Sequence, residues 1–322
     1  MTLRSLVLAC LAALLFGASL TGTTSRAQER CVSGFTCDDP EWRFTYPSRR
    51  VKVVLLAGSI GAFQDEPYGR LIHEWCENAE VRNLSHVGFG AYQLHQVFQD
   101  EVMRNPRFPF GTDGLELWVL WNGGLNSAAS ANRTNRYIRR VFVDAHRRNM
   151  RVVGMTLSPW GSLRDERRWG GAGALETFSN TRSIVDMVMG TATPRDALGP
   201  FVSDRTAPDA AWATNELADV RINLFDSTLR DANAPVRDVA AMRALVERDA
   251  RWRRQTEGLA PAARTQRLDA DARLLSELPR WFLRPEVRGF DPIHPNRAGH
   301  REIARLACPR LPASWGCHCP AQ

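Results

Sequence analysis

The chain has 322 residues, of which 44% are hydrophobic and 24% charged, and it carries a formal net charge of +7. That composition is typical of a globular protein, and the length predicts one large domain. The charge does not indicate a nucleic-acid partner, because nearly all of it is arginine interleaved with acids, as in residues 247–251. Such interleaving is typical of a solvated helix face.

The chain begins with a predicted targeting segment. Arg4 precedes an apolar stretch from Leu6 to Leu20, and residues 25–27 (Ser-Arg-Ala) form a small-residue cleavage site that ends at Ala27. The apolar stretch is too short to span a bilayer, so it predicts a secretory signal peptide over residues 1–27. No later segment is apolar for long enough to cross a membrane. We therefore expect a secreted or periplasmic protein without integral membrane association.

Cysteine usage agrees with export. Removal of the signal peptide leaves an even set of cysteines, and an exported compartment permits disulfides. Their pairing is left open, but their clustering near the two termini predicts bridges that tie down the ends. A metal site at residues 317–319 (Cys-His-Cys) is a weaker interpretation, because a second ligand pair of recognised spacing is missing. The six cysteines that are left after removal of the signal peptide are Cys31, Cys37, Cys76, Cys308, Cys317 and Cys319.

Strands and helices alternate along the predicted domain, which spans residues 51–322 after a polar N-terminal arm at 28–50. The near-continuous apolar run at 51–57 predicts a parallel strand buried on both faces. The alternation that follows predicts an α/β domain with a parallel sheet. Helices are expected at 68–80, 90–103, 131–149, 175–189 and 297–307, and further strands at 81–87, 115–121, 151–157 and 219–225.

Residues 233–280 form a charged, alanine-rich segment that a minimal domain of this kind does not need. Val239, Met242, Leu245 and Val246 recur at helical spacing, so the segment is expected to be helical and to bury one face. It is an insertion that either caps the active site or decorates the edge of the domain. The sequence leaves both alternatives open.

Residues suited to catalysis follow predicted strand ends, where sites lie in parallel α/β sheets. Ser59 follows the first strand, Gly88 the second and Asn126 the third, and Asp291 and His294 stand three positions apart near the C-terminus. A serine needs a base to become a nucleophile, and the base needs a partner that holds its tautomer. An oxyanion hole needs backbone N–H groups and often an asparagine amide.

Taken in chain order, the four short segments that contain these residues resemble the four sequence blocks of the SGNH hydrolases, also called the GDSL esterase family. Residues 57–60 (Ala-Gly-Ser-Ile) are similar to the nucleophile block and residues 83–88 to the second block. Residues 124–127 (Gly-Leu-Asn-Ser) and 291–294 (Asp-Pro-Ile-His) are similar to the third and the last. The blocks span nearly the whole mature chain. The resemblance implies a three-layer α/β/α fold of flavodoxin-like topology.

The resemblance also implies a role for each residue. Ser59 would be the nucleophile, His294 the base and Asp291 its partner, while the N–H groups of Ser59 and Gly88 and the amide of Asn126 would hold the oxyanion. No metal or cofactor is required. We expect a monomer that acts on a small-molecule or glycan ester, such as a carbohydrate acetyl ester or a short-chain lipid ester.

Two positions depart from the family pattern. Gly58 stands where the nucleophile block has an aspartate, and Ser127 stands where the third block has one. Neither missing carboxylate is a nucleophile, a base or an oxyanion donor, so we expect catalysis to survive. Two competitors remain open: Gly90 could replace Gly88, and Asn122 could replace the preferred asparagine at 126.

Other functions remain as alternatives. An α/β-hydrolase elbow would need glycine at positions 57 and 61, and the chain has Ala57 and Gly61. The order of the residues argues against that fold, because the serine closes the first strand and the acid and base are close together. A non-catalytic or acyl-transferring member of the same fold, binding a glycan or acyl ligand, is the other alternative.

Overall fold

The computed structural model describes residues 43–63, 65–202 and 211–321. The predicted signal peptide and most of the N-terminal arm therefore lie outside the described residues, as do Cys31 and Cys37. In the described part of the chain, no helix combines the length and the apolar character that a membrane crossing requires.

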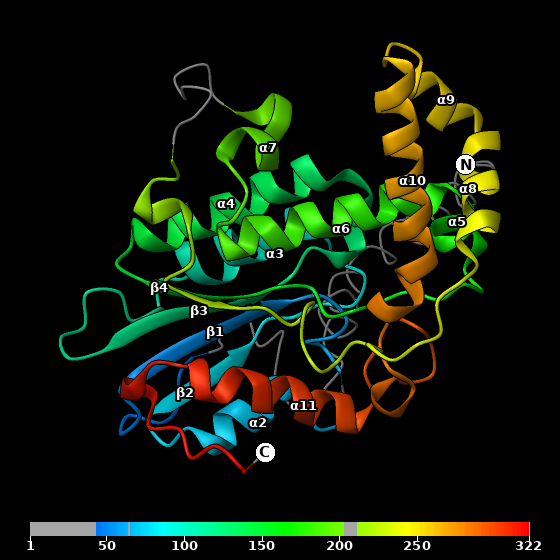
Figure 1. Ribbon diagram of the computed structural model, residues 1–322. Coiled ribbons are helices and arrows are strands. Elements are labelled where there is room, and N and C mark those ends of the chain that lie inside the picture. The colour runs from blue at the N-terminus through cyan, green and yellow to red at the C-terminus, as the bar shows by residue number, and fades with distance from the viewer. Residues whose placement is uncertain (1–42, 64, 203–210, 322) are drawn as a thin grey trace, which may run out of the picture.

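Within these residues, one parallel sheet of five strands lies at the centre, in the order β2-β1-β3-β4-β5 (Figure 1). The strand order reverses between β1 and β3, which is the flavodoxin-like pattern of doubly wound α/β folds. This confirms the predicted fold class. The strands are β1 (Val51–Ala57), β2 (Ala79–Asn83), β3 (Glu116–Asn122), β4 (Arg151–Met155) and β5 (Val220–Ile222).

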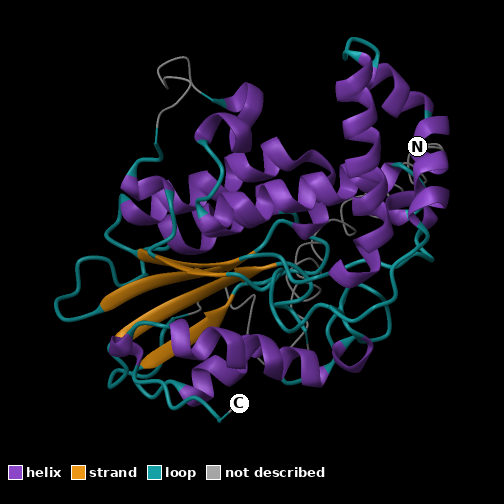
Figure 2. Ribbon diagram, in the orientation of Figure 1, coloured by secondary structure: helices purple, strands orange, loops and turns teal. Residues whose placement is uncertain are grey.

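Helices cover both faces of the sheet and make three layers (Figure 2). One face carries α3 (Ala91–Phe98), α4 (Ala131–His146) and α6 (Gly173–Met189), and the other carries α2 (Tyr68–Trp75) and α11 (Arg297–Ala307). The short helices α5 (Glu166–Trp169) and α7 (Pro194–Leu198) pack against α6.

Every residue of β1 is buried, as the sequence predicts for a strand covered on both faces. Val54 and Leu56 pack into the layer of α3 and α4, and Val53 and Leu55 pack into the layer of α2 and α11. Full burial of each such side chain contributes roughly 1.5–3 kcal/mol. The one charged residue in this strand, Lys52, is only 4% exposed and needs a buried partner.

The predicted helix at 68–80 is shorter in the structure. It ends at Trp75 because Cys76 takes an extended backbone and forms a disulfide with Cys317. The second disulfide joins Cys308 to Cys319. Both of these bridges involve the C-terminal tail, as expected for that end of the chain; the expectation for the N-terminal end falls on Cys31 and Cys37, which lie outside the described residues. The bridges also make the metal interpretation of residues 317–319 wrong, because both cysteines are oxidised.

Other boundaries shift for local reasons. The helix expected at 90–103 becomes α3 followed by a π-helical turn, Gln99–Met103. The last strand ends at Ile222 and not at 225, because the Thr156 hydroxyl accepts the N–H groups of Leu224 and Phe225 at 2.8 and 3.1 Å. A side chain thus replaces the ladder of hydrogen bonds there. The predicted final helix, at 297–307, is confirmed without change.

The insertion at 233–280 is helical, as predicted, and contains α8 (Val239–Arg248), α9 (Ala250–Thr256) and α10 (Pro261–Glu277). α10 packs against α8 and contacts α6, and the far end of this arm stands away from the sheet (Figure 1). Val246 is buried, but Val239 is 44% exposed, so its predicted place on the buried face is wrong. It lies in the first turn of α8, outside the packed stripe.

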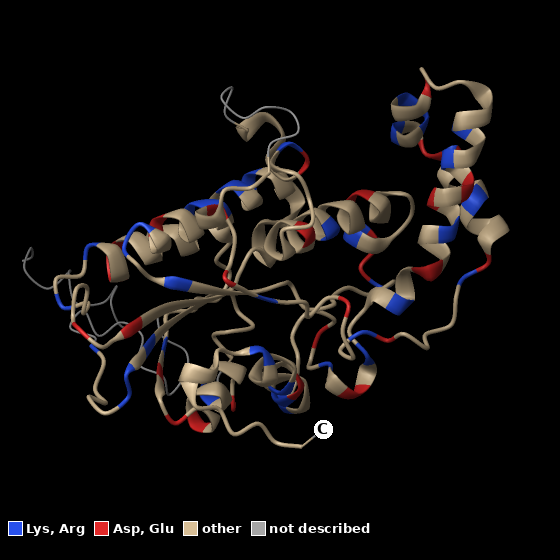
Figure 3. Ribbon diagram, turned by 60° about the vertical axis from the view of Figure 1, so that its left-hand side comes forward, with Lys and Arg blue, Asp and Glu red and all other residues tan. Residues whose placement is uncertain are grey.

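Charged residues of both signs are interleaved over the helices (Figure 3). Ion pairs one turn apart join Arg70 to Glu74 and Arg182 to Asp186. The only lysine of the chain behaves differently. Its Nζ lies 2.8 Å from Oε2 of Glu80 on the neighbouring strand, and both side chains are at most 5% exposed.

Glu80 accepts further hydrogen bonds from the segment that leads into the sheet. The backbone N–H groups of Thr45 and Tyr46 donate to its two oxygens at 2.6 and 3.0 Å. Burial by itself would raise the pKa of Glu80, but the hydrogen bonds from Lys52 and from these N–H groups outweigh it and lower the pKa. The carboxylate therefore fastens residues 43–50 to the sheet.

Lys52→Met should remove the closer of the two cations at the buried Glu80 carboxylate, because Nε of Arg82 also lies 3.5 Å from Oε1, and should lower the free energy of unfolding at neutral pH by about 3 kcal/mol in urea titrations. The folded-state pKa of Glu80 is below its ordinary value of 4.5, so its stabilisation is present above that value and is lost as the pH falls through the folded-state pKa. The deficit of the variant should therefore shrink in acid.

The exposed pair Arg70–Glu74 supplies the control, with its arginine side chain 57% exposed. Arg70→Met should lower the free energy of unfolding by less than about 1 kcal/mol. Equal losses in the two variants would contradict a special role for the buried pair.

Candidate active site

The structure brings Ser59, His294 and Asp291 together at the carboxyl edge of the sheet. Nε2 of His294 lies 2.8 Å from Oγ of Ser59, although 235 positions separate them in the sequence. Nδ1 of the same ring lies 2.7 Å from Oδ2 of Asp291. The imidazole thus bridges a hydroxyl and a carboxylate, which is the geometry that activates a serine.

Ser59 lies in a tight turn directly after β1. The N–H groups of Gly61 and Ala62 both donate to the carbonyl of Gly58 at 3.1 Å, which closes the turn around the serine. A Cβ atom at position 61 would lie 2.5 Å from Oγ of Ser85, closer than atoms can approach. Glycine is therefore required where the chain leaves the turn.

Asp291 is held by the loop that it begins. Its Oδ1 accepts the backbone N–H groups of Ile293 and His294, both at 2.8 Å. Burial alone would raise the pKa of Asp291, but these two hydrogen bonds and the one from the His294 ring lower it. The ionised carboxylate accepts the Nδ1–H of the imidazole, which leaves Nε2 free to accept the serine hydroxyl proton.

Two further elements fix the same loop. The N–H of Gly289 donates to the carbonyl of His294 at 2.7 Å, closing the loop on itself. Asn296 then caps α11, with its side-chain oxygen accepting the N–H of Gly299 at 2.9 Å, as the sequence predicts. The histidine is therefore positioned by a closed loop on one side and a capped helix on the other.

Gly88 and Asn126 line one hollow of about 330 Å³ beside this arrangement, which we call the Asn126 hollow; Tyr92 and Tyr137 line it too. Gly88 has a φ of +79°, which favours glycine. Within the described residues, the backbone N–H groups of Ser59 and Gly88 have no acceptor. The Asn126 amide donates to the carbonyl of Phe89 at 3.1 Å, and its second N–H remains available.

The two competing residues serve the fold. Asn122 is buried, accepts the Tyr68 hydroxyl at 3.1 Å and donates to the carbonyl of Thr156 at 2.8 Å, so it ties β3 to its neighbours. The N–H of Gly90 donates to the side chain of Gln93 at 3.2 Å, which caps α3. Both competitors are thus occupied, and this favours Gly88 and Asn126 as the donors near the serine.

Gly58 and Ser127, the two residues that depart from the family pattern, each have a role in packing near the serine turn. A Cβ atom at Gly58 would lie 3.1 Å from Nδ2 of Asn126, so the bare glycine lets this amide approach the serine turn. The hydroxyl of Ser127 accepts the N–H of Ala91 at 3.1 Å and the hydroxyl of Thr134 at 2.9 Å. The small residue at 127 therefore supports the start of α3 directly.

Two aromatic contacts of the site were not predicted from the sequence. The Phe290 ring stacks on His294 with centroids 5.3 Å apart and planes 14° apart, yet it is 87% exposed. In α11, the buried His300 ring stacks on the Phe63 ring, with the two centroids 4.2 Å apart. Burial and the nearby His294 lower the pKa of His300 to about 3, so it stays neutral and serves the structure, as expected. The position of Phe290 next to Asp291 was the only available signal.

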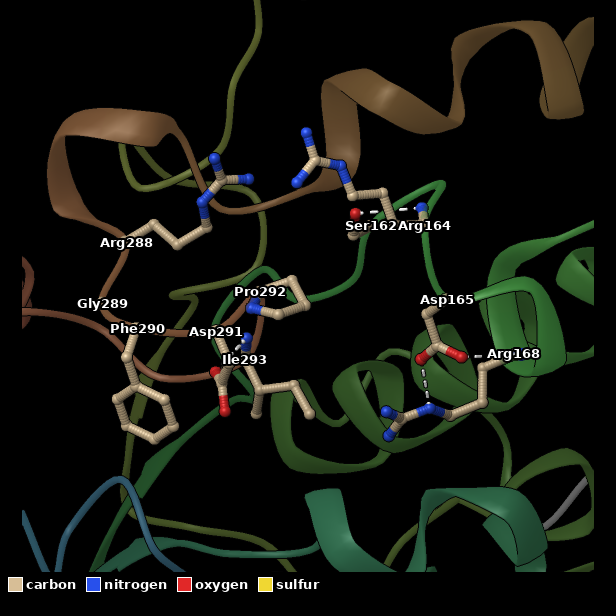
Figure 4. Close-up of a pocket in the computed structure, with 10 residues that line it drawn as sticks. All are labelled: Ser162, Arg164, Asp165, Arg168, Arg288, Gly289, Phe290, Asp291, Pro292 and Ile293. Atoms are coloured by element: carbon tan, nitrogen blue, oxygen red, sulfur yellow. Dashed lines mark hydrogen bonds and ion pairs between the residues drawn. The ribbon is translucent and has the colours of Figure 1, made fainter.

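A second, larger hollow of about 690 Å³ lies against the loop that carries Asp291 (Figure 4). Neither this hollow nor the Asn126 hollow is lined by a residue of the insertion at 233–280. Of the two alternatives left open for the insertion, this favours edge decoration over a cap.

The sequence matches no family model, and no curated protein matches it. Among solved structures, it is similar to the acetyl xylan esterase AlAXEase, at 14% sequence identity and a TM-score of 0.42, with 79% of this chain and 96% of that chain covered. It is also similar to a catalytic mutant of Axe2, an acetylxylan esterase from Geobacillus stearothermophilus, at 11% identity and a TM-score of 0.42, with 84% and 97% covered. These similarities concern the fold alone, so the reaction is inferred from this chain's own residues.

The two asparagines should separate in their effect on stability. Asn122→Ala leaves the buried Tyr68 hydroxyl and the Thr156 carbonyl without partners and should lower the free energy of unfolding by roughly 1–3 kcal/mol in urea. Asn126→Ala removes an exposed side chain and should change it by less than about 0.5 kcal/mol. Equal destabilisation by both variants would show that our distinction between them is wrong.

Proposed function

We propose that this protein is a secreted or periplasmic serine esterase of the SGNH type, which hydrolyses a carboxylic ester through an acyl-enzyme intermediate. The observation that carries the proposal is the hydrogen-bond chain from Asp291 through His294 to Ser59. The disulfides Cys76–Cys317 and Cys308–Cys319 support export, because such bonds persist in oxidising compartments.

In the first half of the proposed reaction, Oγ of Ser59 attacks the acyl carbon while Nε2 of His294 takes the hydroxyl proton. The carboxylate of Asp291 stabilises the imidazolium that forms. His294 then gives the proton to the departing alcohol oxygen, and the acyl group remains on the serine. In the second half, a water oxygen attacks the acyl carbon while Nε2 of His294 accepts a proton from the water. The bond between the acyl carbon and Oγ of Ser59 then breaks, His294 returns the proton to Oγ, and the acid is released.

The negative charge that develops on the acyl oxygen needs donors that are already in place. The unoccupied N–H groups of Ser59 and Gly88 and the amide of Asn126 are the candidates, because Asn126 approaches the serine turn at Gly58 and Gly88 lines the same hollow as Asn126. No step of this scheme requires a metal or a cofactor.

The substrate is proposed to be a carbohydrate acetyl ester or a short-chain lipid ester. The Asn126 hollow, about 330 Å³ in volume, supports a small acyl group, because it is near the lower end of the range for ligand sites. Transfer of the acyl group to an acceptor alcohol would use the same residues. The ratio of free acid to transferred acyl product, measured with an added alcohol, distinguishes the two reactions.

A non-catalytic binding protein on the same fold is the alternative from another class. A fluorophosphonate probe separates the two, because it labels only an activated serine. The wild-type protein should be labelled and should hydrolyse p-nitrophenyl acetate, whereas Ser59→Ala should lose both properties. Ser179→Ala, which changes an exposed serine on α6, should keep both. Full hydrolysis by the Ser59 variant would overturn the proposal.

The proposed role of Asn126 as an oxyanion donor leads to a second prediction, a loss of catalytic rate. Asn126→Ala should lower kcat by roughly 10²–10³, the usual effect of removing one such donor, while probe labelling and folding persist. Asp100→Ala, in an exposed ion pair with Arg104, should leave kcat unchanged. An unaltered kcat in the Asn126 variant would remove this amide from the mechanism.

A further inference from the structure

The larger hollow beside the catalytic loop has walls from two distant segments, residues 162–168 and 288–293 (Figure 4). They are joined by a hydrogen bond from the N–H of Gly161 to the carbonyl of Pro292, at 3.0 Å. Because Pro292 directly follows Asp291, the wall of this hollow is continuous with the catalytic loop. A group bound there would lie next to the proposed reaction centre. We call it the arginine hollow, after the arginines that line it.

Three arginines line the arginine hollow: Arg164, Arg168 and Arg288. Arg168 is already engaged, since its Nε donates to Asp165 and its guanidinium lies 5.4 Å from the centre of the Trp160 ring. The other two guanidinium groups have no carboxylate partner among the described residues. Figure 4 shows both side chains extended toward one another across the hollow.

The acids of the arginine hollow do not compensate these charges. Asp165 pairs with Arg168 and accepts its backbone N–H, which caps α5, and Asp291 serves His294. Two unpaired guanidinium groups facing one hollow are therefore a local surplus of positive charge.

Guanidinium groups are planar forks that match carboxylate, sulfate and phosphate groups. Phe290 adds a different contact: its ring lines the same hollow, stacks one face on His294 and is 87% exposed. An exposed aromatic face offers a flat apolar surface of the kind that the face of a sugar ring can cover. Two guanidinium groups and an exposed aromatic ring thus line one hollow, and the ring is in contact with the proposed catalytic histidine.

We propose that the arginine hollow is a subsite for an anionic group on the alcohol part of the ester, so that the preferred substrate is an O-acetylated acidic glycan. This inference rests on the proposed esterase function and specifies its substrate. The sugar ring that bears the ester packs on Phe290, and a carboxylate or sulfate on that sugar or its neighbour binds Arg164 and Arg288. The acyl group occupies the Asn126 hollow.

The test compares acetylated oligosaccharides of equal length, one containing glucuronate, one containing a sulfated sugar and one neutral, with p-nitrophenyl acetate as the anion-free reference. The wild-type kcat/KM should be at least tenfold higher for an anionic oligosaccharide than for the neutral one. The two anionic arms identify whether carboxylate or sulfate is preferred. This advantage should shrink with added NaCl, because salt screens exposed charges.

Arg164→Gln combined with Arg288→Gln should lower the kcat/KM for the anionic oligosaccharide, relative to that for p-nitrophenyl acetate, by at least tenfold. The matched control is Arg305→Gln, in the last turn of α11 at the opposite edge of the sheet, which should leave this ratio unchanged. A wild type without preference for either anionic oligosaccharide, or a ratio that the double substitution does not alter, would overturn the subsite.

Direct binding separates this inference from the proposed function. Calorimetric titration with unacetylated glucuronate and sulfated oligosaccharides should give a Kd that is at least tenfold higher for the double variant than for the wild type. If no ester is hydrolysed but this difference is found, the esterase function fails and the anionic subsite stands. If Ser59-dependent hydrolysis is found without any anionic preference or binding difference, the esterase stands and the subsite fails.

Discussion

All seven residues of β1 are buried, and much of the molecule follows from that burial. A parallel strand without a solvated face must be covered by helices on both sides, which produces the three layers. Its neighbours, β2 and β3, lie on either side of it, so the strand order reverses beside its carboxyl end. A residue that follows β1 therefore emerges at the crevice where doubly wound folds place their sites. Ser59 is that residue.

The proposed base and its partner reach the same crevice from the opposite end of the chain. They lie in a closed loop ahead of α11, whose buried face packs with α2 against β1. The stacking of His300 on Phe63 links α11 to the segment just after Ser59. The tail beyond α11 is fastened by the disulfide between Cys76 and Cys317. Helix packing and a covalent bridge thus hold together residues that are far apart in sequence.

Charge is used in two contrasting ways. Lys52 and Glu80 are buried, and each is satisfied by the other and by backbone groups, so their charges serve the fold. Arg164 and Arg288 instead line a hollow beside the loop of Asp291 and His294, and no acid among the described residues neutralises them. Unpaired charge is retained where solvent or a ligand can reach it, because burial of an unpaired charge would cost too much.

The sequence alone determined the α/β class, the helical insertion and the candidate residues Ser59, Asp291 and His294, because apolar periodicity and short motifs are local properties. Local pattern could not choose between Asn122 and Asn126, or between Gly88 and Gly90. Only the tertiary structure showed that Tyr68, Thr156 and Gln93 occupy the competitors. It alone also paired Cys76 with Cys317 and Cys308 with Cys319, stacked Phe290 on His294 and joined residues 162–168 to 288–293 around one hollow. Apart from the local stacking of Phe290 on His294, these are contacts between segments that are separated in the sequence, which only the packing of the whole chain decides.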